Sequence, residues 1–260
     1  MERGIHTPGP LEGTIDGALH IQTPSRAEHG PEGVLIFSLF LLLAALLPSP
    51  AYAQEKMWKE LNTKLRTLYQ QGRYAEAAKV AKEALKVAEA TFGPDHPDVG
   101  VSLNNLALMY KAQGKYAEAE PLYKRALVIK EKALGPTHLQ VATSLNNLAV
   151  LYEAQGKYAE AEPLYRRALS IAEKELGPTH PQVAASLNNL AVLYYLQGKY
   201  AEAEPLYKRE LVLYQKTLGP EHPDMPKVLE NMAELYKKTG REDEARKFEE
   251  RAKAIRSRNK

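Results

Sequence analysis

The 260-residue sequence contains no cysteine, only one tryptophan and four phenylalanines. The absence of cysteine excludes disulfide bonds, thiolate metal sites and cysteine nucleophiles, so packing alone must hold the fold together. The net charge of +3 is too small a surplus to indicate a partner that is a nucleic acid. Hydrophobic residues make up 44% and charged residues 26% of the chain, which is typical of a globular protein and excludes a polytopic membrane protein.

Long apolar runs are also scarce, and the one that is present spans residues 34–47. As a helix it would be about 21 Å long at roughly 1.5 Å per residue, short of a hydrocarbon core of about 30 Å. Prolines follow it, and then the small residues Ala51 and Ala53. We expect residues 33–53 to be a signal peptide cleaved after Ala53 or a short membrane anchor, and the protein to be exported (periplasmic, secreted or attached to the cell envelope).

The segment before this run, residues 1–32, is rich in Gly, Pro, His and Thr and has no apolar periodicity. It cannot bury enough surface to offset the entropy of ordering, so we expect it to be disordered. Its acidic balance differs from the positive stretch of a typical signal peptide. Three explanations stay open: a translation start downstream of Met1, a retained anchor, and a cytoplasmic protein with a fortuitous apolar tract.

A 42-residue repeat dominates residues 54–260. Glycines at 72, 114, 156, 198 and 240 are each 42 apart, and segments 101–142 and 143–184 share 33 of 42 residues. Such a period indicates one supersecondary unit stacked on copies of itself. The predicted repeats cover about 59–100, 101–142, 143–184, 185–226 and 227–260.

Each unit contains two helical patterns separated by a glycine. Leu103, Leu106, Ala107 and Tyr110 follow the spacing i, i+3, i+4, i+7, which places them on one face of a first helix. A second helix follows Gly114 and carries two apolar stripes, as a helix packed between neighbours must. The sequence therefore predicts an all-α solenoid of helical hairpins.

The two terminal copies depart from the pattern by polar substitution. Lys64 stands where the other copies have leucine or methionine, and Glu249 and Lys253 replace apolar or aromatic residues in the last copy. Terminal repeats need a polar outer face, so five repeats are expected to make the whole solenoid.

The strings Ser102-Leu-Asn-Asn-Leu-Ala107 and Gln113-Gly-Lys-Tyr-Ala-Glu-Ala119, with Leu122-Tyr-Lys-Arg-Ala-Leu127, resemble the tetratricopeptide repeat in its longer kinesin-light-chain-like form. The resemblance covers residues 57–255. It implies a right-handed superhelix that acts as a non-enzymatic scaffold binding a protein or peptide.

Catalytic and metal motifs are missing from the sequence. The histidines of the linkers recur once per repeat, at His96, His138, His180 and His222. Equivalent points in neighbouring repeats are on the order of 10 Å apart, too far to share a zinc ion. We expect these histidines to help cap the following helix, within capping boxes such as Thr137 to Gln140, and we expect neither a metal nor a cofactor.

Four asparagines occupy one position in the first helices, although asparagine is a poor helix former. Two explanations stay open: each amide bonds the neighbouring repeat, or the amides form a ladder that binds the backbone of an extended peptide. In kinesin light chains the matching asparagines hold cargo peptides, and the resemblance implies this role here. Adjacent positions that differ between copies would set specificity. The predicted peptide-binding residues are Asn105, Asn147, Asn189, Asn231, Asn104, Asn146, Asn188, Leu108, Lys111, Val150, Glu153, Val192 and Tyr195.

The function expected from these features is peptide binding along the groove of the first helices. The alternative is a structural assembly module that organises a complex through the edges or ends of the solenoid while the groove stays empty.

Overall fold

The computed structural model describes residues 50–258, and within this range it consists of ten α-helices and no strand. Their bounds are α2 Pro50–Gln70, α3 Tyr74–Phe92, α4 Pro97–Ala112, α5 Tyr116–Leu134, α6 Leu139–Ala154, α7 Tyr158–Leu176, α8 Pro181–Leu196, α9 Tyr200–Thr217, α10 Met225–Lys238 and α11 Glu242–Arg258. The expected all-α solenoid is confirmed.

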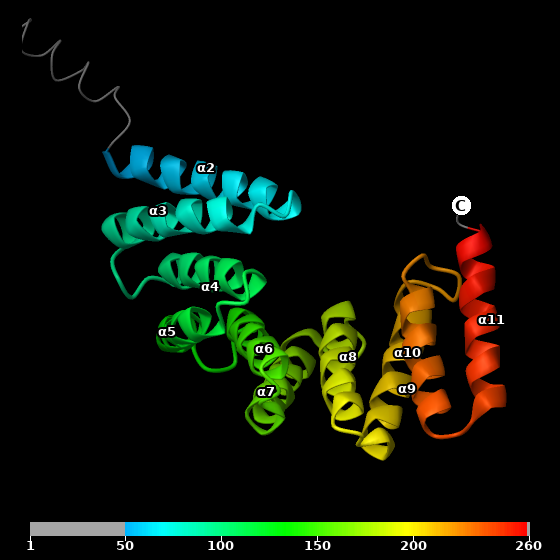
Figure 1. The fold of residues 1–260 in the computed structure, drawn as a ribbon. Coiled ribbons are helices and arrows are strands. Elements are labelled where there is room, and N and C mark those ends of the chain that lie inside the picture. Colours follow the sequence, from blue (N-terminus) through cyan, green and yellow to red (C-terminus); the bar gives the residue numbers. More distant parts are fainter. Residues whose placement is uncertain (1–49, 259–260) are drawn as a thin grey trace, which may run out of the picture. The chain divides into compact units, whose positions relative to one another are not determined.

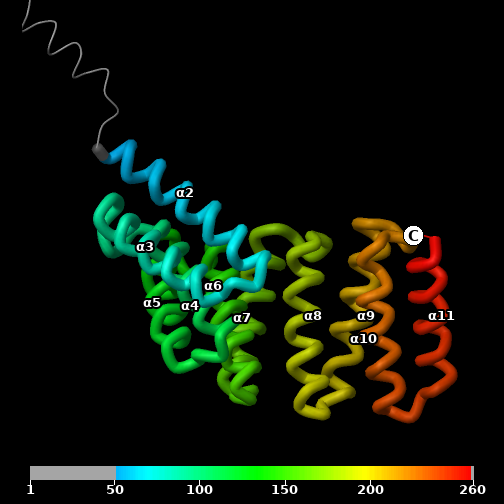
Figure 2. The backbone as a smooth tube through the Cα atoms, turned by 45° about the horizontal axis from the view of Figure 1, so that its top comes forward, coloured from blue at the N-terminus to red at the C-terminus, as the bar shows by residue number. Residues whose placement is uncertain are grey.

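The helices associate as five hairpins in chain order (Figures 1 and 2). We call α2, α4, α6, α8 and α10 the first helices and their partners the second helices. Each second helix also packs against the first helix of the next hairpin, and α4 contacts α6 directly. The first helices thus bring equivalent positions of neighbouring repeats close together.

Glycine and histidine fix the ends of the helices. Gly114 has φ of 73°, a left-handed conformation that ends α4 and lets the chain reverse. At the start of α6 the cap is His138, whose Nδ1 accepts a hydrogen bond from the backbone N–H of Gln140 at 3.1 Å. The prediction that the linker histidines cap the helices is confirmed for His96, His138 and His180. The N-cap of α10 is Asp224 instead, and His222 accepts from the backbone N–H of that residue just outside the helix. The prediction of a capping box that begins at Thr137 was wrong, because the side chain that caps the helix is the imidazole of His138.

Small residues and tyrosines form the core. Ala107 and Ala119 are fully buried, which allows the backbones of α4 and α5 to approach closely. Tyr123 and Tyr165 are almost fully buried in the same hydrophobic cluster, which continues through the later hairpins to Ala245. The last four hairpins therefore share this cluster, whereas the core of the first hairpin belongs to a second cluster that begins at Leu61 and ends at Met109 on α4.

A polar junction recurs between hairpins. The hydroxyl of Tyr152 on α6 donates to Glu120 on α5 at 3.2 Å, and Lys124 also binds this carboxylate at 2.7 Å. Equivalent Tyr–Glu bonds join Tyr194 to Glu162 at 2.9 Å and Tyr236 to Glu204 at 3.4 Å. We call this unit the Tyr–Glu junction. At its last copy Arg241 lowers the pKa of Glu204 to about 2 through a hydrogen-bonded ion pair.

The solenoid ends are polar, as predicted: Lys64, Glu249 and Lys253 are all exposed. At the N-terminal side, α2 already begins at Pro50, so the predicted cleavage point after Ala53 lies within its first turn. The apolar run and the segment predicted to be disordered lie outside the described residues. Among the helices of residues 50–258, none combines the length and hydrophobicity needed to cross a membrane.

Candidate functional site

The predicted site residues all lie on the first helices, four each on α4, α6 and α8 and one on α10. None of the thirteen is fully exposed. They follow the same face because the 42-residue period places identical positions of successive helices side by side. The structure gives the asparagines among them two distinct environments.

At the two ends of the face, the asparagines are bonded to the neighbouring repeat. Asn105 donates through Nδ2 to Oδ1 of Asn62 on α2 at 2.9 Å, and Asn231 donates to Oδ1 of Asn188 at 2.9 Å. In both bonds the acceptor lies 43 residues earlier in the chain, on the first helix of the preceding repeat. Here the amides stabilise the stacking of hairpins.

In the middle of the face, the same bond is not made. The side chains of Asn147 and Asn189 form no hydrogen bond with any residue in the described part of the chain, and both residues are half-buried. Asn104 donates to Oγ of Ser144 at 3.0 Å, but its Oδ1 is buried without a partner, as is Oδ1 of Asn146. The middle of the asparagine ladder is therefore open.

The variable positions carry partly desolvated charge. Burial lowers the pKa of Lys111 and raises the pKa of Glu153, and each group moderates the shift of the other electrostatically. Glu153 accepts a hydrogen bond from the hydroxyl of Tyr165 at 3.0 Å. The ring of Tyr195 lies 5.6 Å from that of Tyr200. We call Lys111, Glu153 and Tyr195 the variable row. It presents a cation, an anion and an aromatic ring on three successive first helices.

Leu108, Val150 and Val192 are partly buried and pack against the hydrophobic core. They leave only part of their surface to a ligand. Sequence comparison of the copies marked these positions as variable, and the structure shows that they also serve packing.

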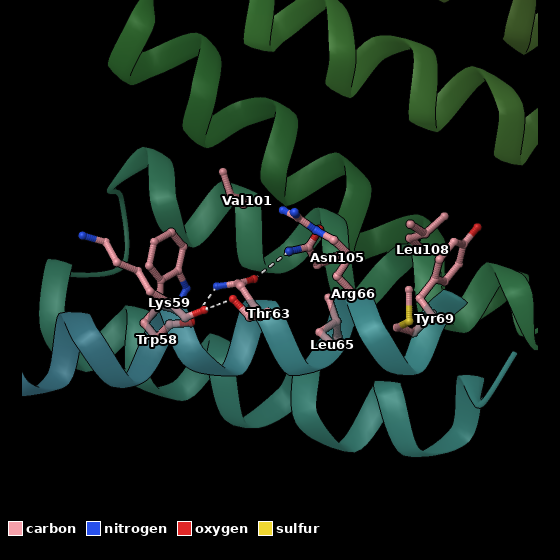
Figure 3. A pocket seen from close by; sticks show the side chains of 11 residues that line it. Trp58, Lys59, Thr63, Leu65, Arg66, Tyr69, Val101, Asn105 and Leu108 are labelled. Atoms are coloured by element: carbon pink, nitrogen blue, oxygen red, sulfur yellow. Dashed lines mark hydrogen bonds between the residues drawn. The ribbon is translucent and has the colours of Figure 1, made fainter. Parts of the chain in front are cut away.

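A pocket of about 530 Å³ opens between α2 and α4 (Figure 3). Asn105 and Leu108 line it together with residues that the sequence analysis did not select, including Trp58, Arg66 and Tyr69. Figure 3 shows Trp58 at one end and Tyr69 at the other, with Asn105 between them. Asn105 is the residue that donates to Asn62. This pocket extends the predicted face to the first hairpin.

A second pocket, of about 340 Å³, lies among α8, α9 and α10. Its lining contains Asn188 and Asn189 and, from α9, Glu210. The signal for Glu210 was present in the sequence, because the same position holds Ala84, Ala126, Ala168 or Ala252 in the other copies. A pattern of repeated polar residues does not reveal Glu210, because it occurs in only one copy.

These features define a class of protein: a helical-repeat solenoid with a polar, partly open face and repeated junctions. The chain belongs to the tetratricopeptide repeat family, whose model matches residues 66–132, 102–174, 140–211 and 182–258. Tetratricopeptide repeats form protein-interaction scaffolds, so this is the general function of the chain.

Solved structures agree with this assignment. The chain is similar to a kinesin light chain-related protein of Podosopora anserina with nearly identical TPR-like repeats, at 29% identity over 77% of this chain and 95% of that one, with a TM-score of 0.69. It is also similar to BtubC (BKLC) of P. vanneervenii, at 27% identity over 76% and 79% of the two chains, with a TM-score of 0.68.

The fold extends to more distant structures. Aspartyl phosphate phosphatase F of Bacillus subtilis gives a TM-score of 0.69 at 16% identity, over 89% of this chain and 57% of that one. This likeness concerns the fold alone. A search of curated proteins gives no match.

Proposed function

We propose that the protein binds an extended peptide along the first helices, across α4, α6 and α8, and that Asn147 and Asn189 hold the peptide backbone. The observation that carries this proposal is the open middle of the asparagine ladder. A carboxamide offers two donors and an acceptor with two lone pairs, which match the N–H and C=O groups of a main chain. Half-buried amides without a partner are groups whose hydrogen-bonding capacity a ligand can use.

The two asparagine pairs that are hydrogen-bonded at the ends of the face, which we call the closed pairs, show which internal hydrogen bond a peptide would have to replace. Asn147 stands in the same relation to Asn104 as Asn105 does to Asn62, so rotation of the Asn147 amide toward Asn104 would close the ladder. Peptide binding then exchanges one internal hydrogen bond for bonds to the ligand. This exchange keeps the net gain per amide small.

Magnitudes indicate that side-chain pockets decide affinity. Two open amides provide about four hydrogen bonds worth roughly 1 kcal/mol each. Ordering five or six peptide residues costs about 1–2 kcal/mol per residue. The surplus must come from the variable row and from the pocket between α2 and α4, and we expect dissociation constants of about micromolar size.

The test is selection of linear peptides from a displayed random library on the full-length chain, followed by calorimetric measurement of the best binder. The double substitution Asn147→Ala and Asn189→Ala is expected to weaken binding by tenfold or more with little change in stability. The matched control is Asn105→Ala with Asn231→Ala, which changes the same position in the two closed pairs.

The control should lower stability by about 1 kcal/mol per site, because Asn62 and Asn188 lose their donors, while binding changes less. If the central variant binds the selected peptide as tightly as the unaltered protein, the groove is not the binding site. That result would favour the assembly module, with contacts at the edges or ends of the solenoid.

A further inference from the structure

Glu210 is the least expected residue of the solenoid interior. Its side chain is only 3% exposed, and its Oε2 is buried without any hydrogen-bond partner. The equivalent positions hold alanine in the other four copies. A buried carboxyl group with an unpaired oxygen destabilises a fold. Because it occurs in only one of the five repeats, it indicates a ligand-binding role at this position.

The surroundings of Glu210 form a cavity instead of a packed core. The cavity has a volume of about 340 Å³ and is lined by Asn189, whose side chain forms no hydrogen bond within the described residues. Asp224 and Lys227 line it from the N-terminal end of α10. The volume lies at the lower end of the usual range for ligand pockets, about 300–1,000 Å³. Asn189 belongs to the open ladder, so the cavity opens onto the proposed peptide path.

We propose that this cavity receives the guanidinium group of an arginine side chain of the bound peptide, with Glu210 as its counter-ion and Asn189 and Asp224 as further acceptors. The inference rests on the proposed function and specifies the ligand as a peptide with arginine at this point. A guanidinium group has five N–H donors in a fixed fork, so one group can serve several acceptors at once.

Lys227 is the competing internal cation. It lines the cavity and lowers the pKa of Glu210 somewhat, yet it is exposed and forms no ion pair with that carboxylate in the described residues. An ammonium group on a flexible stem loses side-chain entropy when it is drawn into a pocket. Lys227→Ala should therefore strengthen arginine binding by removing a like charge.

The protonation state of Glu210 provides a second way to test this inference. Burial raises the pKa of Glu210 to about 8, against the opposing effect of Lys227. The other titratable groups near it are Tyr207 and Tyr214, whose pKa values are raised, and Asp224. At neutral pH the free protein holds Glu210 mostly protonated. Arrival of a guanidinium group favours the carboxylate, so binding releases a proton.

The experiment titrates the full-length chain with the capped tripeptide acetyl-Ala-Arg-Ala-amide and with the same peptide carrying neutral citrulline. The side-chain carboxyl carbon of Glu210 is observed by NMR and assigned by its absence in Glu210→Gln. Saturating arginine peptide should lower the pKa of Glu210 by one unit or more, and the citrulline peptide should leave it unchanged. Affinity for the arginine peptide should rise by about sixfold or more between pH 6.5 and 8.5.

Two variants keep the test decisive. Glu210→Gln should abolish both the preference for arginine and the pH dependence. Glu210→Ala restores the residue found in the other copies, so it provides a folded control if the glutamine variant is unstable. Equal binding of the two tripeptides, pH-independent affinity, or undiminished binding by both variants would overturn the proposal.

Failure of the arginine-cavity proposal can be distinguished from failure of the proposed peptide groove. The tripeptide needs only the cavity, whereas the library-selected peptide reports on Asn147 as well. Loss of arginine selectivity with groove binding retained would refute the cavity alone.

Discussion

At the scale of single residues, Lys130 and Gly100 form a coupled pair. Lys130 on α5 is only 3% exposed, and equivalent positions hold Ala88 and Ala172. Across from it, Gly100 takes the place of Ala142 and of an alanine in the next copy. A Cβ added at Gly100 would lie 3.2 Å from Cγ of Lys130, so the missing methyl group makes room for the lysine stem.

The first prediction is that Lys130→Ala stabilises the protein. Burial lowers the pKa of Lys130 to about 8 from 10.5 in the unfolded chain. Between these values the unfolded state binds more protons, so stability of the parent rises with pH. The gain from the substitution should therefore be largest at pH 7, on the order of 1–3 kcal/mol, and should shrink toward pH 10.5. Urea unfolding at both pH values measures it, and a gain that grew with pH would contradict the argument.

The second prediction concerns coupling within the same pair. Gly→Ala inside a helix stabilises by about 0.5–1 kcal/mol when there is room for the methyl group. Gly100→Ala should give this full gain only in the Lys130→Ala background, where the pair matches that of the next repeat. With Lys130 present the gain should be smaller or reversed. A double-mutant cycle tests this, and purely additive effects would show that the two residues do not interact.

The repeat alignment points to both positions, since each departs from its copies. It does not show that the departures face each other, because that depends on how α4 and α5 pack. The open and closed asparagines could not be predicted for a similar reason. Their sequence positions are equivalent, and the difference lies in side-chain rotation between neighbouring helices.

At the scale of elements, the Tyr–Glu junction explains how each hairpin is fixed to the next. It is incomplete between the first two hairpins, where Ala78 takes the place of Glu120. The other members are present: Lys82 lies 5.7 Å from the ring centre of Tyr110 on α4. The third prediction is that Ala78→Glu stabilises the protein by about 0.5–1.5 kcal/mol, because Tyr110 and Lys82 gain a common acceptor.

Urea unfolding and hydrogen exchange of α2 and α3 provide the measurement. Ala78→Gln is the matched control, since its amide accepts the tyrosine hydrogen bond without the charge and should give a smaller gain. An unchanged midpoint for the glutamate variant would mean that the junction contributes little to stacking.

The helix boundaries, by contrast, were largely predictable. Glycines such as Gly114 need positive φ, and that requirement is local, so sequence alone locates the turns. The capping histidine was predicted for the same reason. What the sequence leaves open are contacts between repeats, which include the pockets at both ends of the ladder.

At the scale of the whole molecule, the fourth prediction is that export removes residues 1–53 and leaves Gln54 at the N-terminus. The solenoid should tolerate this cut, because the buried core of α2 begins at Leu61 and Gln54 itself accepts a hydrogen bond from Thr91 on α3 at 3.2 Å. Mass spectrometry of the protein from a secreting host measures the cleavage site. A retained segment 33–53 in a membrane fraction would support the anchor, and one in the cytosol would contradict export.

The fifth prediction follows from the equivalence of the junctions. Deleting residues 143–184 removes one full period, so α5 should meet α8 through the same contacts that it now makes with α6. Glu120 would accept from Tyr194 in place of Tyr152, and Arg209 would pair with Glu131 as Arg167 does now at 2.5 Å. The four-hairpin chain should therefore fold cooperatively, with lower stability and a smaller urea m-value in proportion to the lost surface.

The control deletion, 143–182, is two residues shorter. It joins Ala142 to Val183 and leaves two extra residues in the helix. At roughly 3.6 residues per turn, these rotate the apolar face of the helix after the junction by about 200°. Leu187 then falls at the position of Asn147, so buried and exposed residues exchange places and the chain should fail to form a cooperative solenoid. Because the in-register deletion removes Asn147 but keeps Asn189 and Glu210, it should also lose groove affinity while retaining arginine selectivity. If both deletions unfold alike, stacking depends on more than the 42-residue period.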